Sequence, residues 1–168
     1  MQTKEYFSAM GDKAIFFDQI REGDIGGVTT LLSNQPEWIN IRDERGFTPL
    51  ILASYYGHVE LTQFLLDKGA GIDETDGSGN TALLGVCFKG YDALVKLLLE
   101  AGANVNHKNT MGATALIYAA TFNNINIAEL LLAHNADISV KDARGNTALD
   151  QARMQEAKPM IALLEASS

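Results

Sequence analysis

Apolar and polar positions recur along this chain at a fixed spacing of 33 residues. The apolar pattern forms two leucine columns: Leu50, Leu83, Leu116 and Leu149, then Leu65, Leu98, Leu131 and Leu164. A glycine column keeps the same spacing: Gly46, Gly79, Gly112 and Gly145. A threonine follows each glycine by two residues, and an Asp or Asn precedes it by three. Such self-similarity indicates an array of repeated structural units.

Each unit is predicted to contain two short helices. The threonine suits a helix N-cap, and the next residue, Pro49 or an alanine, suits the first helical position. The first helices are expected to run for about eight residues and to end at a Gly or Asn, the usual residues in a left-handed helix-ending conformation. These residues are Gly57, Gly90 and Asn123. The second helices are expected over residues 59–66, 92–99 and 125–132, ending near Gly69, Gly102 and Asn135.

A short extended segment and a turn complete the predicted unit. The extended segments are Ile72-Asp73, Val105-Asn106 and Ile138-Ser139. Each leads into an Asp/Asn-x-x-Gly turn, in which a side-chain acceptor begins the turn and glycine completes it. A unit of this size cannot bury its own apolar face, so the units must stack on one another.

The repeat resembles the ankyrin repeat. The resemblance is carried by Gly46-Phe47-Thr48-Pro49-Leu50 with Ala53, Gly57-His58, Leu65-Leu66 and Gly69-Ala70, and by residues 102–106, over roughly residues 12 to 164. It implies an all-α solenoid of helix pairs joined by β-turn or hairpin loops, which binds other proteins through a concave face. One departure is that the family's usual His after the leucine is Ile51, Leu84, Ile117 or Asp150 here. We expect apolar burial between repeats to substitute for the hydrogen bonds of that His.

The two ends are predicted to be capping repeats of one domain, residues 1–168. The N-terminal cap is expected at 12–42, full repeats at 43–75, 76–108 and 109–141, and the C-terminal cap at 142–168. Glu165 stands where earlier units have leucine, as a solvent-facing last helix requires. The loop at 33–38 carries one extra residue, and Trp38 in it is expected to cover the apolar edge of the cap. Closed ends favour a monomer.

Composition narrows the class of protein. Apolar residues make up 46% of the chain, which is too many for a disordered chain, and the single Cys excludes an internal disulfide. A net charge of −8 argues against nucleic acid or an anionic membrane as the main partner. Neither a signal peptide nor a membrane span is recognisable, so a cytoplasmic location is expected. Residues 1–75 hold −6 of the net charge, which predicts that a basic partner would dock near the N-terminal end.

Catalytic, metal-binding and cofactor-binding residues are not expected. His58, His107 and His134 fall in different units without metal-ligand spacing, and His58 suits a structural role. Cys87 occupies a small-residue helical position and is expected to be packed and inert. The stretch from Gly77 to Ala82 formally matches a dinucleotide-binding fingerprint, but polar residues precede it where a buried strand is required.

The candidate partner-binding residues come from the resemblance, which places the turn tips and the ends of the first helices on the concave face. They are Arg45, Phe47, Tyr55, Tyr56, Phe88, Lys89, Met111 and Phe122. Aromatic side chains often dominate interface energetics, so these rings form a candidate binding stripe. The alternative is that the rings pack between repeats. Asn106 occupies a position at which animal ankyrin repeats can be hydroxylated, and its modification stays open.

Three functions are therefore weighed. The first is a non-enzymatic module that captures a partner protein, of unknown identity, through the concave face. The second is an acidic inhibitor or immunity-type protein that neutralises a basic enzyme, whose binding would weaken steeply with salt. The third is an enzyme or small-molecule binder, which would need a convergent polar pocket.

Overall fold

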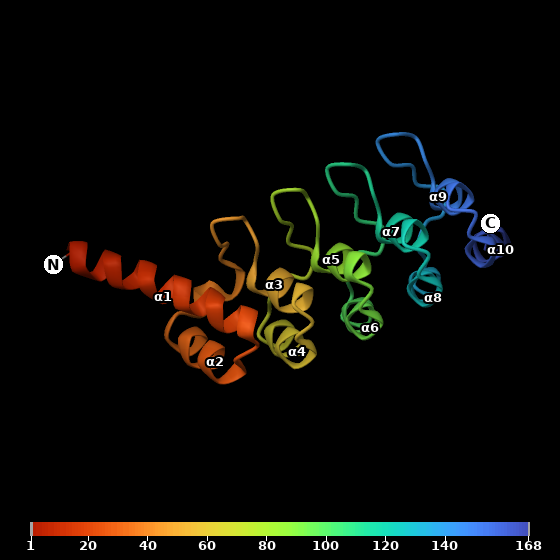
Figure 1. Cartoon of the computed structure of the whole chain (residues 1–168). Coiled ribbons are helices and arrows are strands. Elements are labelled where there is room, and N and C mark those ends of the chain that lie inside the picture. Colours follow the sequence, from red (N-terminus) through yellow and green to blue (C-terminus); the bar gives the residue numbers. More distant parts are fainter. Residues whose placement is uncertain (1, 168) are drawn as a thin grey trace.

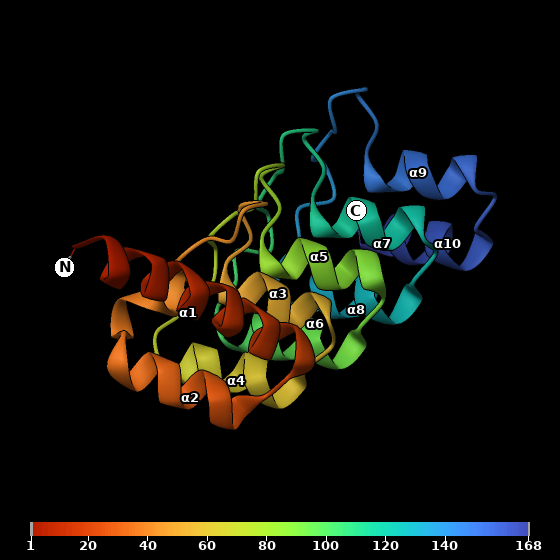
Figure 2. The same ribbon diagram turned by 60° about the vertical axis from the view of Figure 1, so that its left-hand side comes forward.

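A computed structural model describes the backbone of residues 2–167 and the side chains of residues 11–167. This part of the chain forms helices and turns without a strand. The helices pair into stacked units, with α3, α5, α7 and α9 in an inner row beside the turns and α2, α4, α6, α8 and α10 in an outer row (Figure 1). The four turns project side by side from the inner row (Figure 2). The sequence therefore predicted the all-α solenoid correctly.

The helix bounds agree closely with the repeat pattern. The inner helices are α3 (Pro49–Tyr55), α5 (Ala82–Lys89), α7 (Ala115–Thr121) and α9 (Ala148–Met154). The outer helices are α4 (Val59–Asp67), α6 (Asp92–Glu100), α8 (Ile125–Ala133) and α10 (Lys158–Ala166). The first three outer helices each extend one residue past the predicted end. Within residues 2–167, no helix is both long and apolar enough to cross a bilayer.

Each inner helix begins at the predicted threonine. The hydroxyl oxygens of Thr48, Thr81, Thr114 and Thr147 each accept a hydrogen bond from the backbone N–H three residues later, at 3.2–3.4 Å. These bonds satisfy an N–H that the first turn of a helix would otherwise leave unpaired. At Asp150 the bond is reciprocal, because its carboxylate also accepts the backbone N–H of Thr147.

The predicted helix ends are confirmed by the backbone. Gly90 has φ +74°, and Asn123, which replaces glycine in the next repeat, has φ +52°. In the last repeat the equivalent residue is Glu156, also at φ +52°, which the sequence pattern did not single out. Asn tolerates this region better than other side chains, whereas Glu adopts it rarely.

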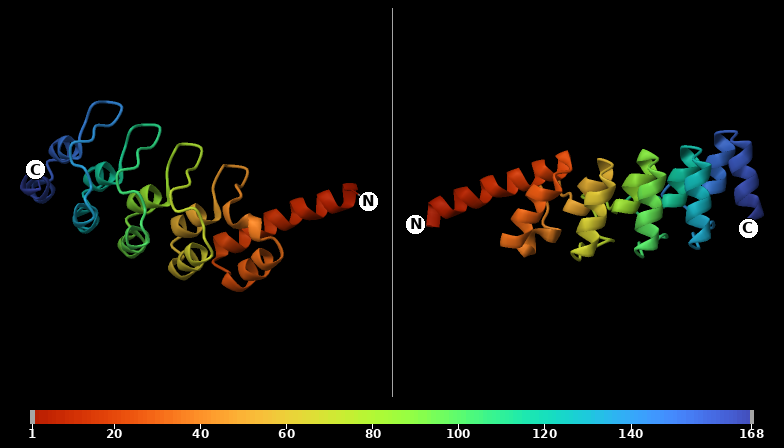
Figure 3. Two further views of the ribbon diagram at one scale, coloured as in Figure 1. Left: turned by 180° about the vertical axis from the view of Figure 1, so that it is seen from behind. Right: turned by 90° about the horizontal axis from the view of Figure 1, so that it is seen from below.

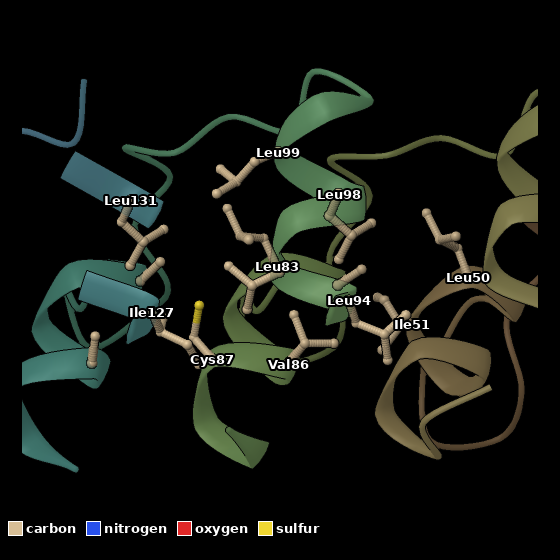
Figure 4. Close-up of a cluster of buried hydrophobic side chains, with 14 of the residues drawn as sticks. Leu50, Ile51, Leu83, Val86, Cys87, Leu94, Leu98, Leu99, Ile127 and Leu131 are labelled. Atoms are coloured by element: carbon tan, nitrogen blue, oxygen red, sulfur yellow. The ribbon is translucent and has the colours of Figure 1, made fainter. Parts of the chain in front are cut away.

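The core runs without interruption through the stack. The leucines of the second column, Leu65, Leu98, Leu131 and Leu164, are all buried. Cys87 lies beside Ile127 of the following repeat, and Val86 lies toward Ile51 of the preceding one (Figure 4). Ile51, Leu84 and Ile117 are buried where the family carries His, so apolar packing does occupy those positions.

The N-terminal helix is longer than the sequence pattern indicates. Helix α1 spans Gln2–Glu22, so it begins ten residues before the predicted start of the cap, and its first half extends beyond the stack (Figure 3). Helix α2 (Ile25–Asn34) completes the pair, and the 3₁₀ helix η1 (Pro36–Asn40) follows it. Trp38 in η1 is buried, with its ring 5.5 Å from that of Phe16, and therefore has the structural role expected.

At the other end, the last helix carries Glu165 where earlier repeats have leucine. Glu165 is exposed, and its Oε1 lies 2.9 Å from Nη2 of Arg153 on the neighbouring helix. An exposed ion pair of this kind adds little stability, but it gives the final repeat a hydrated outer surface.

Candidate functional site

An open groove of about 310 Å³ lies on the inner face, between α3, α5 and α7 and the first two turns. Its volume is at the lower end of the range for ligand pockets, about 300–1,000 Å³. The lining side chains are mostly apolar or aromatic. They belong to Arg45, Phe47, Ile51, Leu52, Tyr55, Tyr56, Asp76, Asn80, Thr81, Leu84, Phe88 and Tyr118, with Gly85 between them. We call this surface the inner groove.

The aromatic rings around the inner groove are exposed and also touch one another. Tyr55 is 40% exposed and Phe88 is 51% exposed. The Phe88 ring meets Phe122 edge to face at 5.3 Å and Tyr118 at 6.2 Å, both in the next repeat. The same rings therefore pack between repeats and present about half of their surface to solvent.

Two cations are held over ring faces at the groove. The Arg45 guanidinium carbon lies 5.2 Å from the Phe47 ring centre, and Lys89 Nζ lies 4.9 Å from that of Tyr55. Cation–π contacts of this kind are worth roughly 0.5–1 kcal/mol at exposed sites. Among the described side chains, no carboxylate lies within ion-pair distance of either cation. Neither cation therefore forms an ion pair with a described side chain, and Asp76 supplies a carboxylate to the groove lining.

A chain of polar contacts borders the groove on the side of the turns. Asn109 Nδ2 donates to Asn80 Oδ1 and to Tyr118 Oη, both at 2.9 Å. Asn80 Nδ2 in turn donates to Asp76 Oδ2 at 3.2 Å. This explains why Asn109 is the one amide in a column of aspartates, since a carboxylate could not donate either bond.

Gly85 lines the inner groove from helix α5. It lies within helix α5 and does not have a positive φ, so its backbone conformation does not require glycine. A Cβ at this position would have one near neighbour outside the adjoining backbone, Tyr55 Cδ2 at 3.9 Å, which is an ordinary contact. The same column carries Leu52 before it and Tyr118 after it. A glycine between two large residues leaves a gap in the inner row.

The structure brings most of the predicted stripe together. Five of the eight candidates, Arg45, Phe47, Tyr55, Tyr56 and Phe88, line the inner groove. Lys89 covers Tyr55, and Phe122 packs against Phe88, so both adjoin it. Met111 is exposed on its turn but does not line the groove. Sequence reasoning missed Tyr118 and Gly85. A comparison of the equivalent positions 52, 85, 118 and 151 would have identified both.

The acidic residue that lines the groove, Asp76, comes from a turn and not from an inner helix. Helices α3, α5 and α7 carry no acidic residue. Acidic residues are instead placed on the outer helices: Glu60, Asp67, Asp92, Glu100, Glu129 and Glu165. The charge of residues 43–75 is near Tyr55 in sequence, but its helical part, on α4, belongs to the outer row. The other acidic residues of this segment, Asp43, Glu44, Asp73 and Glu74, lie outside the helices, and Glu44 directly precedes the groove-lining Arg45.

The other chemically reactive side chains have structural roles. Ring nitrogens of the three histidines lie 2.8–2.9 Å from backbone carbonyl oxygens, those of Arg21, Gly79 and Leu130. Cys87 is buried, and desolvation, with the negative charge of Asp92 as a smaller cause, raises the pKa of its thiol. Residues 11–167 contain no group of His, Cys, Asp and Glu that could hold a metal. Gly79 lies in a turn rather than after a strand.

Asn106 has a role between repeats. Its Oδ1 accepts the backbone N–H of Asp137 at 2.8 Å. The residues 33 and 66 positions earlier, Asp73 and Asn40, accept the equivalent N–H of their own following repeats at 2.9 and 2.8 Å. The amide side chain thus belongs to a ladder that ties successive repeats together.

Stacked helix pairs with projecting turns define a helical solenoid protein. A family model described as ankyrin repeats (3 copies) matches residues 18–109 and 85–167, and the chain belongs to the ankyrin-repeat family. Ankyrin repeats are a protein–protein interaction module.

Two curated relatives match short segments of the chain. The chain is 46% identical to DNA-binding protein RFXANK of Mus musculus over 63 residues, 38% of this chain and 23% of that protein. It is 48% identical to NAD-capped RNA hydrolase NUDT12 of Homo sapiens over 48 residues, 29% of this chain and 10% of that protein. The matches thus span less than a quarter of these relatives.

Proposed function

We propose that this chain captures a partner protein through its concave inner face, with the inner groove as the principal contact. The observation that carries the proposal is the clustering of half-exposed aromatic side chains around one groove. Tyrosine and phenylalanine bury large areas at small entropic cost, and such residues cluster in interface hot spots. In this proposal the chain is a monomer that acts in the cytoplasm without a cofactor, and its partner is neither nucleic acid nor a membrane.

The relatives favour a binding module over a shared activity. One is named as a DNA-binding protein and the other as an RNA hydrolase, yet each matches this chain over a short segment. Two different named activities are more simply reconciled if the matched segments serve recognition. The net charge of −8 and the apolar inner helices give phosphate backbones little to bind.

The test is affinity capture with the purified chain. The Tyr55→Ala/Phe88→Ala double variant should lose the proteins that wild type retains. The matched control is Phe64→Ala on outer helix α4, since Phe64 also carries a lysine over its ring, at 5.6 Å. Each lost ring contact contributes about 0.5–1.5 kcal/mol, so the double variant should keep its helical circular dichroism spectrum.

Retention of the same partners by the double variant would refute the proposal. Loss with Phe64→Ala instead, together with steep weakening by salt, would support an acidic inhibitor that acts through its outer row. Monomeric state is tested separately by light scattering, where a mass of 18.2 kDa is expected.

A further inference from the structure

The inner groove combines apolar side chains with two cations that form no ion pair among the described side chains. Arg45 lines it at the end formed by the turns, and Lys89 adjoins it at the C-terminal end of α5. Neither has a carboxylate partner among the described side chains. Asp76, the acidic residue in the lining, already accepts hydrogen bonds from Ser78 and Asn80. Two cations, Arg45 in the lining and Lys89 beside it, thus face one carboxylate, and this favours an anionic occupant.

The length of the groove limits what that occupant can be. Helix α5, which forms one wall, has 8 residues from Ala82 to Lys89. At a rise of 1.5 Å per residue it is about 12 Å long. An extended polypeptide covers that distance in roughly four residues. Gly85 lines the same groove as Arg45, and the groove volume of about 310 Å³ is large enough for an apolar side chain.

We propose that the inner groove takes an extended acidic segment of the partner protein, with an apolar side chain over Gly85 and acidic side chains facing Arg45 and Lys89. This rests on the proposed function and adds the chemistry of the partner. The two acidic residues lie about four positions apart in the partner, because that spacing spans the groove.

Cationic occupants are disfavoured by the same contacts. An aromatic groove binds ammonium groups when its ring faces are free. Here Arg45 and Lys89 already occupy faces of Phe47 and Tyr55. A third cation would meet like charge on two sides, and like charges placed together across an interface oppose binding.

The experiment uses random peptides displayed on phage, selected on the immobilised full chain and counter-selected on Gly85→Leu. The leucine fills the gap in the inner row. The matched control is Gln151→Leu, the same position in the last repeat, which does not line the groove. Peptides enriched by wild type and by Gln151→Leu are expected to carry an aromatic or aliphatic residue between two acidic ones.

Charge reversal then tests the cations with one enriched peptide, labelled for fluorescence anisotropy. Arg45→Glu and Lys89→Glu should each weaken binding by about tenfold, and more at low salt. Arg144→Glu, at the position equivalent to Arg45 in the last repeat, should leave affinity unchanged.

The outcomes separate this inference from the proposed function. Groove-dependent peptides with basic or uncharged flanks would overturn the acidic chemistry and leave a protein-binding groove in place. Unchanged affinity in Arg45→Glu and Lys89→Glu would do the same. If no enriched peptide depends on Gly85, the groove does not take an extended segment. The proposed function would still be upheld if wild type captures a folded partner and Tyr55→Ala/Phe88→Ala does not.

Discussion

Gly85→Ala should make the protein more stable. Glycine within a helix is less favourable than alanine by about 0.5–1 kcal/mol, because it loses more backbone freedom on folding. The new methyl group would lie 3.9 Å from Tyr55 Cδ2, so it meets no steric barrier. The expected gain is therefore about 0.5–1 kcal/mol, which corresponds to a rise in Tm of about 1–4 °C for a chain of this size.

Replacement of Gly90 by alanine, at the end of the same helix, should change the stability in the opposite direction. Gly90 ends α5 with φ +74°, and the nearest atom to an added Cβ is Asn124 Nδ2 at 3.5 Å. Space is therefore adequate, and the cost is conformational. A left-handed conformation costs a residue with a Cβ roughly 1–2 kcal/mol, so Gly90→Ala should lower Tm.

Thermal and urea unfolding followed by circular dichroism measure both variants. A fall in stability for Gly85→Ala would show that the position is not an open helical site, and the description of the groove would be wrong. A rise, accompanied by weaker binding of a groove-dependent peptide, would show that glycine is kept there for binding at the expense of stability. Such an exchange of stability for function is common at binding sites.

Three further substitutions test other parts of the fold. Asn109→Asp removes the amide that donates to Tyr118 Oη, and should lower the unfolding free energy in urea by about 1–2 kcal/mol. Hydrogen bonds from Thr147 lower the pKa of Asp150 below its usual 3.8. The stabilisation by the ionised carboxylate is therefore present above pH 3.8 and is lost as the pH falls through the lowered pKa. The difference in Tm between wild type and Asp150→Asn should vanish at acid pH. The buried thiol of Cys87 should react with a thiol reagent only in urea, and fast reaction of the native protein would contradict its burial.

The repeated part of the fold could be predicted because each signal acts locally. A threonine cap, a glycine or Asn with positive φ, and a leucine facing the next unit each depend on a few neighbouring residues. Asn123 shows this well, since its backbone adopts the left-handed conformation expected of a glycine substitute. Helix α1 begins earlier than predicted because the 33-residue pattern has no column there to mark its start.

The groove could be predicted only in part. Rings at Tyr55 and Phe88 were found from their place before the helix ends. The gap at Gly85 was missed because it depends on side chains in three successive repeats. Glu60 is close to Tyr55 along the chain but lies on an outer helix, whereas Glu44 lies on the turn that carries the groove-lining Arg45. Proximity in sequence does not tell which face of a stacked unit a residue occupies.

Hydroxyl-radical footprinting of the chain with and without a captured partner tests most directly whether the inner groove is the binding surface. Aromatic and methionine side chains report their own solvent exposure in such a measurement. We expect protection of Tyr55, Tyr56 and Phe88 in the complex, with Met154 in the last repeat unchanged. Protection of Phe64 on the outer row, with Tyr55 and Phe88 as reactive as in the free chain, would place the partner on the opposite face and contradict a groove-centred interface.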